Sequence, residues 1–330
     1  MRTLTRLCIS AAALIYYSAA AIALQSPRCG DAPARSCQAL APVAQKTFEF
    51  HNDFWVNLHH TLYNQAALQK AGHPPDLSTL SQQEASEWNR ALDYYGRNLI
   101  GRSLLDYSMV RINTALAHTA ETSRLTQVED RALRELLENA APIYRAHWWP
   151  AQQRSNQEWM DRISPLVARC EDAVKPALSH AYNSPWPHHR IRVEISYYTT
   201  GVSAYTSLRP TLITISSWSK RNQDTAAVET LFHEASHSLI RKVADEIQAY
   251  QNRTGKKLTH GDLWHAVIFY TTGEIVGRCE PDLVPYAIKY GMWDTAWPNT
   301  LPALDKDWRP YLEGKAKFKA SIDRLVADLQ

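Results

Sequence analysis

The chain has 330 residues, of which 45% are hydrophobic and 21% charged, and its formal net charge is only +3. A chain of this length can bury a substantial core, as one large domain or as two smaller ones. The few excess basic residues are scattered, which excludes a nucleic-acid footprint, so we expect no nucleic-acid partner.

The first 24 residues have the pattern of a secretory signal peptide. Arg2 and Arg6 give a basic start, residues 7–24 are nearly all apolar or small, and residues 21–23 (Ala-Ile-Ala) fit a cleavage site. An uncleaved anchor is the alternative, because the apolar run is long enough to span a bilayer. We expect a periplasmic or secreted protein with no stable membrane span after signal cleavage.

The cysteines fit an exported protein. Signal cleavage removes Cys8 and leaves Cys29, Cys37, Cys170 and Cys279. An even number of cysteines in an exported chain indicates two disulfides. The simplest pairing is Cys29–Cys37 with Cys170–Cys279, and the other two connectivities stay open.

Hydrophobic periodicity predicts helices through the first half of the chain. A flexible lead-in at residues 25–44, rich in Pro, Ala and Ser, precedes a helical region at 45–187. Within it we expect helices at 48–69, 81–100, 103–119, 128–145 and 152–182.

The pattern changes at residue 188, where a second region, 188–330, begins. Residues 189–198 alternate, with Arg192 and Glu194 on one face and Val193 and Ile195 on the other, as in a half-buried strand. A β-branched run at 211–216 predicts a second strand. Helices are expected at 263–278, 280–290 and 304–329. The predicted fold class is α+β and mostly helical, with a small mixed or antiparallel sheet before the helix described next.

The most informative motif is His233-Glu234-Ala235-Ser236-His237. Histidines four residues apart lie on one face of an α-helix, so both rings can reach one metal ion. Glu234 lies one step round the helix, where a carboxylate can take a proton from water that the metal activates. No Pro or Gly interrupts residues 225–250, which predicts one continuous helix through the motif.

Across about residues 190–280 the chain resembles the zincin metallopeptidases, in which two strands also precede an H-E-x-x-H helix. This resemblance implies zinc (Zn2+) as the cofactor, His233 and His237 as metal ligands, and Glu234 as the catalytic base. It also implies that a strand at the sheet edge beside the helix pairs with an extended peptide or protein substrate.

A catalytic zinc ion usually has three protein ligands and one open position. The metzincin continuation is absent, because Ile240 stands at the required glycine and Val243 at the required histidine. A ligand from a second helix, as in gluzincins, remains, and residues 264–274 offer Glu274 and His265. These two are nine residues apart, on opposite sides of a helix, so both are not expected to bind one ion. We favour Glu274, with His265 as the alternative ligand or an oxyanion donor.

Other polar residues have structural and functional interpretations. Candidates for an oxyanion donor are Tyr197, Tyr198, Tyr205, Tyr270 and His265. Asn57, His59 and His60 lie among large apolar groups; we expect them to be satisfied within a helix–helix interface, and a substrate cleft is the alternative.

The sequence therefore predicts an exported zinc-dependent metallopeptidase, a hydrolase that cleaves peptide bonds with water. Two alternatives remain: a noncatalytic zincin-like binding or assembly protein, and a zinc hydrolase of a non-peptide substrate. Metal analysis together with a broad peptide assay distinguishes the first alternative from the enzyme.

Overall fold

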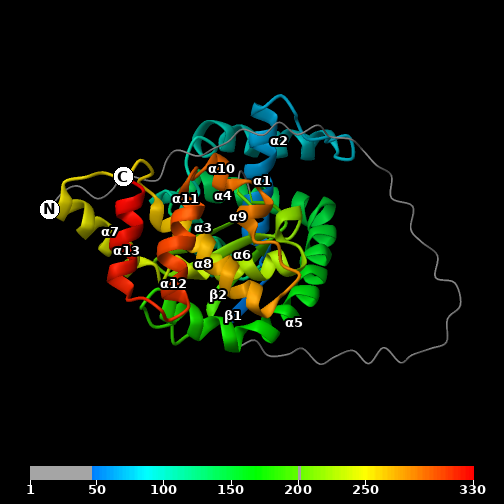
Figure 1. Cartoon of the computed structure of the whole chain (residues 1–330). Coiled ribbons are helices and arrows are strands. Elements are labelled where there is room, and N and C mark those ends of the chain that lie inside the picture. Colours follow the sequence, from blue (N-terminus) through cyan, green and yellow to red (C-terminus); the bar gives the residue numbers. More distant parts are fainter. Residues whose placement is uncertain (1–46, 200–201) are drawn as a thin grey trace, which may run out of the picture. The chain divides into compact units, whose positions relative to one another are not determined.

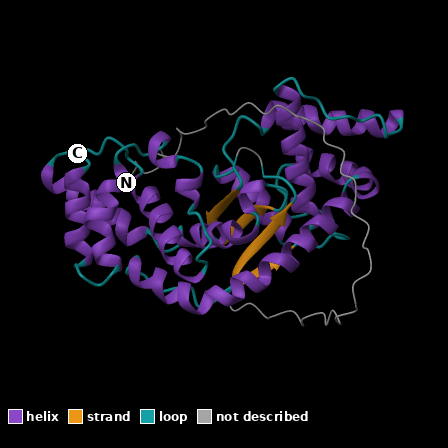
Figure 2. Ribbon diagram, turned by 45° about the vertical axis from the view of Figure 1, so that its right-hand side comes forward, coloured by secondary structure: helices purple, strands orange, loops and turns teal. Residues whose placement is uncertain are grey.

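One mixed four-stranded sheet lies among helices (Figures 1 and 2), which confirms the predicted α+β, mostly helical class. The structure is a computed structural model and describes residues 47–199 and 202–330. The predicted signal peptide, the lead-in at 25–44 and the Cys29–Cys37 pair lie outside these residues. Within the described ranges, no helix combines the length and apolar character that crossing a membrane requires.

The strand order in the sheet is β1-β2-β4-β3. The strands are β1 (Phe48–His51), β2 (Ile191–Ser196), β3 (Ala204–Leu208) and β4 (Thr211–Ser216). The pairs β1–β2 and β2–β4 are parallel, whereas β3 runs antiparallel to β4 at one edge. The predicted strands correspond to β2 and β4; β1 and β3 were not predicted. Because β1 pairs with β2, the sheet joins the two predicted regions across the boundary at residues 187 and 188.

Five helices lie between β1 and β2. They are α1 (Phe54–Lys70), α2 (Gln82–Asn98), α3 (Tyr107–Ala117), α4 (Arg131–His147) and α5 (Trp149–Ala181). All five were predicted, but the first begins later than expected, because residues 48–51 form β1 and Asp53 is the N-cap of α1. The helix α2 begins with a capping box between Ser81 and Glu84, which satisfies two backbone N–H groups at its N-terminus.

The C-terminal half is helical after β4. A short 3₁₀ turn η1 (Lys220–Asn222) precedes α6 (Asp224–Ser236), α7 (Arg241–Thr254) and α8 (Leu263–Cys279). Short segments follow: α9 (Tyr286–Lys289), α10 (Met292–Thr295), α11 (Thr300–Ala303), the π-turn η2 (Leu304–Trp308), α12 (Arg309–Leu312) and α13 (Phe318–Asp328). The long helices predicted at 280–290 and 304–329 are thus wrong in extent, because the chain turns repeatedly there.

The prediction of one continuous helix over 225–250 is also wrong. The helix α6 ends at Ser236, and a turn through residues 237–240 separates it from α7. Ser236 Oγ donates to the carbonyl of Phe232, and Ser238 Oγ donates to the carbonyl of Ala235. Serine hydroxyls compete with backbone N–H groups for these carbonyls, which favours a helix end at this point.

Both faces of the sheet are covered. Ile191, Val193 and Ile195 pack into a core with residues of α5, α6 and α8. On the opposite face, Tyr205 and Leu212 join the core of the α1–α4 helices. The predicted division of β2 into two faces is therefore confirmed, but its polar face is buried as well.

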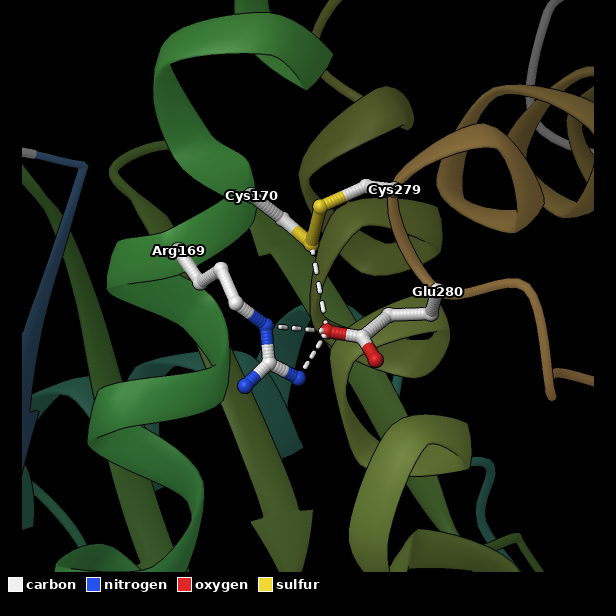
Figure 3. The surroundings of a disulfide bond; sticks show 4 residues. All are labelled: Arg169, Cys170, Cys279 and Glu280. Carbon is white, nitrogen blue, oxygen red and sulfur yellow. Dashed lines mark hydrogen bonds and ion pairs between the residues drawn. A yellow bond between two sulfur atoms is a disulfide. The ribbon is translucent and has the colours of Figure 1, made fainter.

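A disulfide joins α5 to the end of α8. Cys170 and Cys279 are bonded, with a Cα–Cα distance of 5.7 Å, as the sequence predicted. In Figure 3 the carboxylate of Glu280 points between the disulfide and Arg169. The Arg169 guanidinium donates to Glu280 Oε1 at 2.5 Å, whereas the 3.4 Å approach of Cys170 Sγ is a packing contact because a disulfide sulfur has no proton.

We expect the double substitution Cys170→Ala with Cys279→Ala to lower the free energy of unfolding by about 2–5 kcal/mol, because the bond closes a loop with a sequence separation of 109 residues. Urea unfolding of the oxidised protein and of this variant measures the difference. Equal midpoints and equal slopes would contradict a stabilising disulfide.

Candidate metal centre

Three histidines converge from two helices. His233 is in the last turn of α6, His237 directly follows that helix, and His265 is in the first turn of α8. One ring nitrogen from each residue lies within 4.8 Å of the other two, and His233 Nε2 is 3.2 Å from His265 Nε2. The structure therefore brings together the two predicted motif histidines and the alternative third ligand.

Packing between helices holds these rings in place. The helix α6 packs against both α5 and α8, and its apolar residues belong to the main core. The Phe269 ring lies 4.0 Å from the His233 ring, measured between centroids, and Trp264 stacks on His265 at 5.1 Å. The Trp297 and His265 rings form a T-shaped pair with their centroids 5.6 Å apart. An aromatic shell thus limits ring rotation and the access of water.

All three imidazoles are held neutral. Burial lowers the pKa of His237 to about 3 and that of His265 to about 4. Burial also lowers the pKa of His233 well below its usual value, and the nearby His265 and His237 add to this effect. A neutral imidazole keeps a lone pair on one ring nitrogen, which is the form that coordinates metals.

Glu234 lies beside the histidines and has a hydroxyl group as a hydrogen-bond partner. Its Oε2 is 4.0 Å from His237 Nε2 and accepts a hydrogen bond from Thr206 Oγ1 at 2.7 Å. Burial raises the pKa of Glu234 to about 7, while the Thr206 hydrogen bond acts in the opposite direction. A carboxyl group with a pKa near neutrality is suited both to take and to return a proton.

The donor set fits a zinc ion. In a tetrahedral site with Zn–N bonds near 2.0–2.1 Å, two nitrogen ligands lie about 3.3 Å apart. The separation of His233 Nε2 and His265 Nε2, 3.2 Å, is close to that value. Three neutral imidazoles leave the fourth position of a tetrahedron open. A histidine that binds a metal through one ring nitrogen usually donates a hydrogen bond from the other. His233 departs from this pattern, because its Nδ1 is buried without a hydrogen-bond partner among the described residues.

The structure corrects the choice of Glu274. Its carboxylate forms a two-pronged ion pair with Arg309, with N–O distances of 3.1 and 3.3 Å, and it does not belong to the histidine group. Glu274 is nine residues after His265 on α8 and therefore points to the opposite side of that helix. Glu274 is therefore paired with a guanidinium and lies apart from the three histidines.

The predicted tyrosines have other partners. Tyr205 OH bonds to His60 on the far face of β3, and Tyr270 OH donates to Asp305. Tyr197 and Tyr198 pack with Trp218 beyond the ends of β2 and β4. None of these hydroxyls is placed at the histidines by a contact of the described residues.

The buried histidines of α1 are structural. His59 Nδ1 bonds to Tyr95 OH on α2 at 2.8 Å, and His60 bonds to the Val56 carbonyl. Asn57 donates to the carbonyl of Ile195 on β2. The expected helix–helix interface holds for His59, whereas His60 and Asn57 also bond to strands of the sheet, through Tyr205 and Ile195.

Sequence reasoning missed Thr206 and the aromatic shell. Thr206 precedes Glu234 by 28 residues, on the strand β3 that was not predicted. Phe269 and Trp297 resemble ordinary core aromatics in the sequence, and only the packing of α8 against α6 brings Phe269 to His233. No local spacing marks these residues.

A second buried carboxyl group, Glu229, lies one helical turn before His233. Its Oε1 and Oε2 accept from the backbone N–H of Tyr286 at 3.1 and 2.8 Å. A Cβ at Gly273 of α8 would lie 2.9 Å from Pro285 Cβ and 3.3 Å from Glu229 Oε1. The close approach of α8 to Pro285 and Glu229 therefore requires glycine at this position. Burial raises the pKa of Glu229 to about 8, and the Tyr286 N–H opposes that shift.

This raised pKa predicts a pH-dependent stability. An unfolded glutamate has a pKa near 4.3, so the folded protein binds the extra proton between about pH 4.3 and pH 8, and stability falls as the pH rises through that interval. Glu229→Gln should reduce the change in the free energy of unfolding across this pH interval by a few kcal/mol at most, since one pKa unit is worth about 1.4 kcal/mol. Urea unfolding with a chelator present, at about pH 5 and about pH 8, measures it; parallel curves would exclude Glu229 as the cause.

Comparison of this chain with protein-family models, with curated proteins and with solved structures finds no match to any of them.

Proposed function

We propose that this protein is a zinc-dependent hydrolase that cleaves peptide bonds. The observation that carries the proposal is the convergence of three neutral imidazoles beside a buried carboxyl group. His233, His237 and His265 supply ligand atoms within 4.8 Å of one another, and Glu234 Oε2 is 4.0 Å from His237 Nε2. This arrangement provides a metal site and a base in one place.

His233, His237 and His265 would hold the zinc ion. When bound, zinc polarises the substrate carbonyl and makes water a stronger nucleophile at neutral pH. Glu234 takes the proton of the attacking water and later passes it to the leaving amine. Its burial and the aromatic shell limit competing contact with solvent.

Peptide substrates are favoured by the sheet edge next to Glu234. Ser216 N donates to Ser203 O, and these two residues extend the β3–β4 register by one pair beyond Ala204 and Ile215. In an antiparallel pair the bonding direction alternates, so the backbone groups of Ala204, Thr206 and Leu208 point away from β4. Since no other strand pairs with β3 in the described residues, an extended peptide can add to this edge.

We also propose that the protein acts in the periplasm or outside the cell. The Cys170–Cys279 disulfide suits an oxidising compartment, and the N-terminal sequence has the pattern of an export signal.

A zinc assay combined with a peptide library tests the proposed activity. We expect about one zinc ion per chain, turnover of some library peptides, loss of turnover with a chelator and recovery when zinc is restored. Bound zinc without turnover of any peptide would favour the binding-protein alternative. Absence of zinc binding would contradict the proposed site itself.

A further inference from the structure

We propose that His51, Asp53 and Glu194 form a second metal site, which binds a divalent cation such as Mn²⁺ and joins the start of α1 to the sheet. One ligand atom from each of these residues lies within 4.8 Å of the other two. The inference does not depend on the proposed hydrolase activity, because it concerns a different group of residues.

Strand pairing brings the three residues together. In the parallel β1–β2 register His51 is opposite Glu194, so the two side chains are on the same face of the sheet. Asp53 follows His51 by two residues and is the N-cap of α1. The group therefore forms where the chain leaves β1 and enters α1, beside the middle of β2.

This group lies on the opposite face of the sheet from the three histidines. Glu194 is next to Thr214 on β4, and the Thr214 hydroxyl accepts a hydrogen bond from Asn113 of α3. Thr206 comes one residue after the β3 partner of Thr214, so its side chain is on the other face, where it bonds to Glu234. The sheet thus separates the two sites.

Two buried ligand atoms of the group have no hydrogen-bond partner among the described residues. The Glu194 side chain is 0% exposed; its Oε1 accepts from Arg192 Nε at 2.6 Å, whereas its Oε2 has no partner. His51 Nε2 also has none, although Glu49 Oε1 approaches it to 3.4 Å. A carboxylate oxygen and an imidazole nitrogen both offer a lone pair, and a buried acceptor without a partner costs free energy. A cation bound to both atoms removes that cost.

The charges of the group also favour a cation. The Arg192 guanidinium donates to Asp53 Oδ2 and to Glu194 Oε1, both at 2.6 Å, and to the backbone carbonyl of Ala117. When both carboxylates are ionised, one guanidinium faces two negative charges. Buried charges are generally paired or coordinate a metal. A divalent cation at Glu194 Oε2 supplies the second positive charge.

The competing explanation is a proton in place of the metal. Burial raises the pKa of Glu194 to about 8, and the charge of Asp53 acts in the same direction. A carboxyl group that keeps its proton needs no cation and binds none. The two explanations therefore differ in one measurable property, the binding of a metal ion to this group.

The ligand types indicate the class of cation. Carboxylates suit Mg²⁺, Ca²⁺ and Mn²⁺, whereas imidazole suits first-row transition metals, so one imidazole with two carboxylates fits Mn²⁺. Three imidazoles are better suited to zinc. The side chains of His51 and Asp53 are 24% and 31% exposed, so an ion can enter from solvent and water can complete its coordination.

Electron paramagnetic resonance of Mn²⁺ tests the proposal, because the signal of free Mn²⁺ decreases when the ion binds. The protein first receives one equivalent of zinc for the three histidines, and Mn²⁺ is then titrated at about pH 8, where protons compete less for the ligands. We expect about one Mn²⁺ per chain in the wild type. His51→Ala and Glu194→Gln should each weaken Mn²⁺ binding at least about 10-fold, because each removes a ligand.

His73→Ala and Glu313→Gln are the matched controls, since both residues are exposed, and both variants should bind Mn²⁺ like the wild type. Mn²⁺ should also raise the melting temperature of the wild type and leave that of His51→Ala unchanged, because a ligand stabilises only a folded protein that binds it. If Glu194→Gln does not fold, His51→Ala decides the question, since its side chain is only partly buried.

Absence of Mn²⁺ binding by the wild type would overturn the second site and favour the proton. Equal affinities in the wild type, His51→Ala and Glu194→Gln would overturn it as well, because they would show adventitious surface binding only. Loss of Mn²⁺ from His265→Ala, with normal binding in Glu194→Gln, would place the ion at the three histidines and likewise exclude the second site.

Discussion

Glu234→Gln is expected to bind zinc normally and to lose about 10²- to 10⁴-fold in kcat, the range that a general base contributes. The amide has nearly the size of the carboxyl group and can still accept the Thr206 hydrogen bond at 2.7 Å. It has no basic oxygen to take the proton from water. The three histidines do not depend on this side chain, so zinc content measured by atomic absorption should not change.

A matched Glu→Gln substitution at Glu313, an exposed residue that pairs with Lys315, serves as the control and should retain full activity. Full hydrolysis by Glu234→Gln would exclude Glu234 as the base. Loss of zinc from this variant would instead show that the carboxylate takes part in holding the metal.

His265→Ala is expected to weaken zinc binding by at least about 100-fold, because removing a ligand should cost more than removing one of its supporting partners, which costs 10- to 100-fold. Glu274→Ala should bind zinc like the wild type. The Glu274–Arg309 ion pair is partly exposed, so its loss should cost less than about 1 kcal/mol of stability. Competition with a chromophoric chelator measures zinc affinity in both variants.

This pair of variants compares the two ligands that the sequence left open. Zinc loss in Glu274→Ala, with normal binding in His265→Ala, would contradict the histidine site and favour the carboxylate. Unchanged affinity in both would show that neither residue is the third ligand.

The helices and two inner strands were predictable because their patterns are local. The β2 alternation and the β-branched run of β4 give these strands within a few residues. The strand β1 has four residues and depends on pairing with β2, about 140 residues later, so its aromatic sequence was assigned to the following helix. The edge strand β3 has five residues, and beside the strand-favouring Tyr205 and Thr206 it contains Ala204 and Ser207, which are not among the residues enriched in strands.

The motif residues were predictable for the same reason, since four-residue spacing on a helix decides which side chains share a face. The third ligand depends on which side of α8 packs against α6, and sequence spacing does not report that orientation. In the structure the Glu274 carboxylate has a cationic partner. The partner, Arg309, lies 35 residues away in sequence and enters through the fold.

The end of α6 at Ser236 has an electrostatic consequence. The last carbonyl groups of a helix lack intrahelical partners, and aligned peptide dipoles give that end a partial negative charge of about half an elementary charge. His233 and His237 lie in and just after this last turn. Because the effect is confined to the final turn, a helix continuing to Tyr250 would carry its negative end away from the histidines. The early end of α6 instead places this partial negative charge near His233 and His237, while His265 lies in the first turn of α8, where the partial charge has the opposite sign.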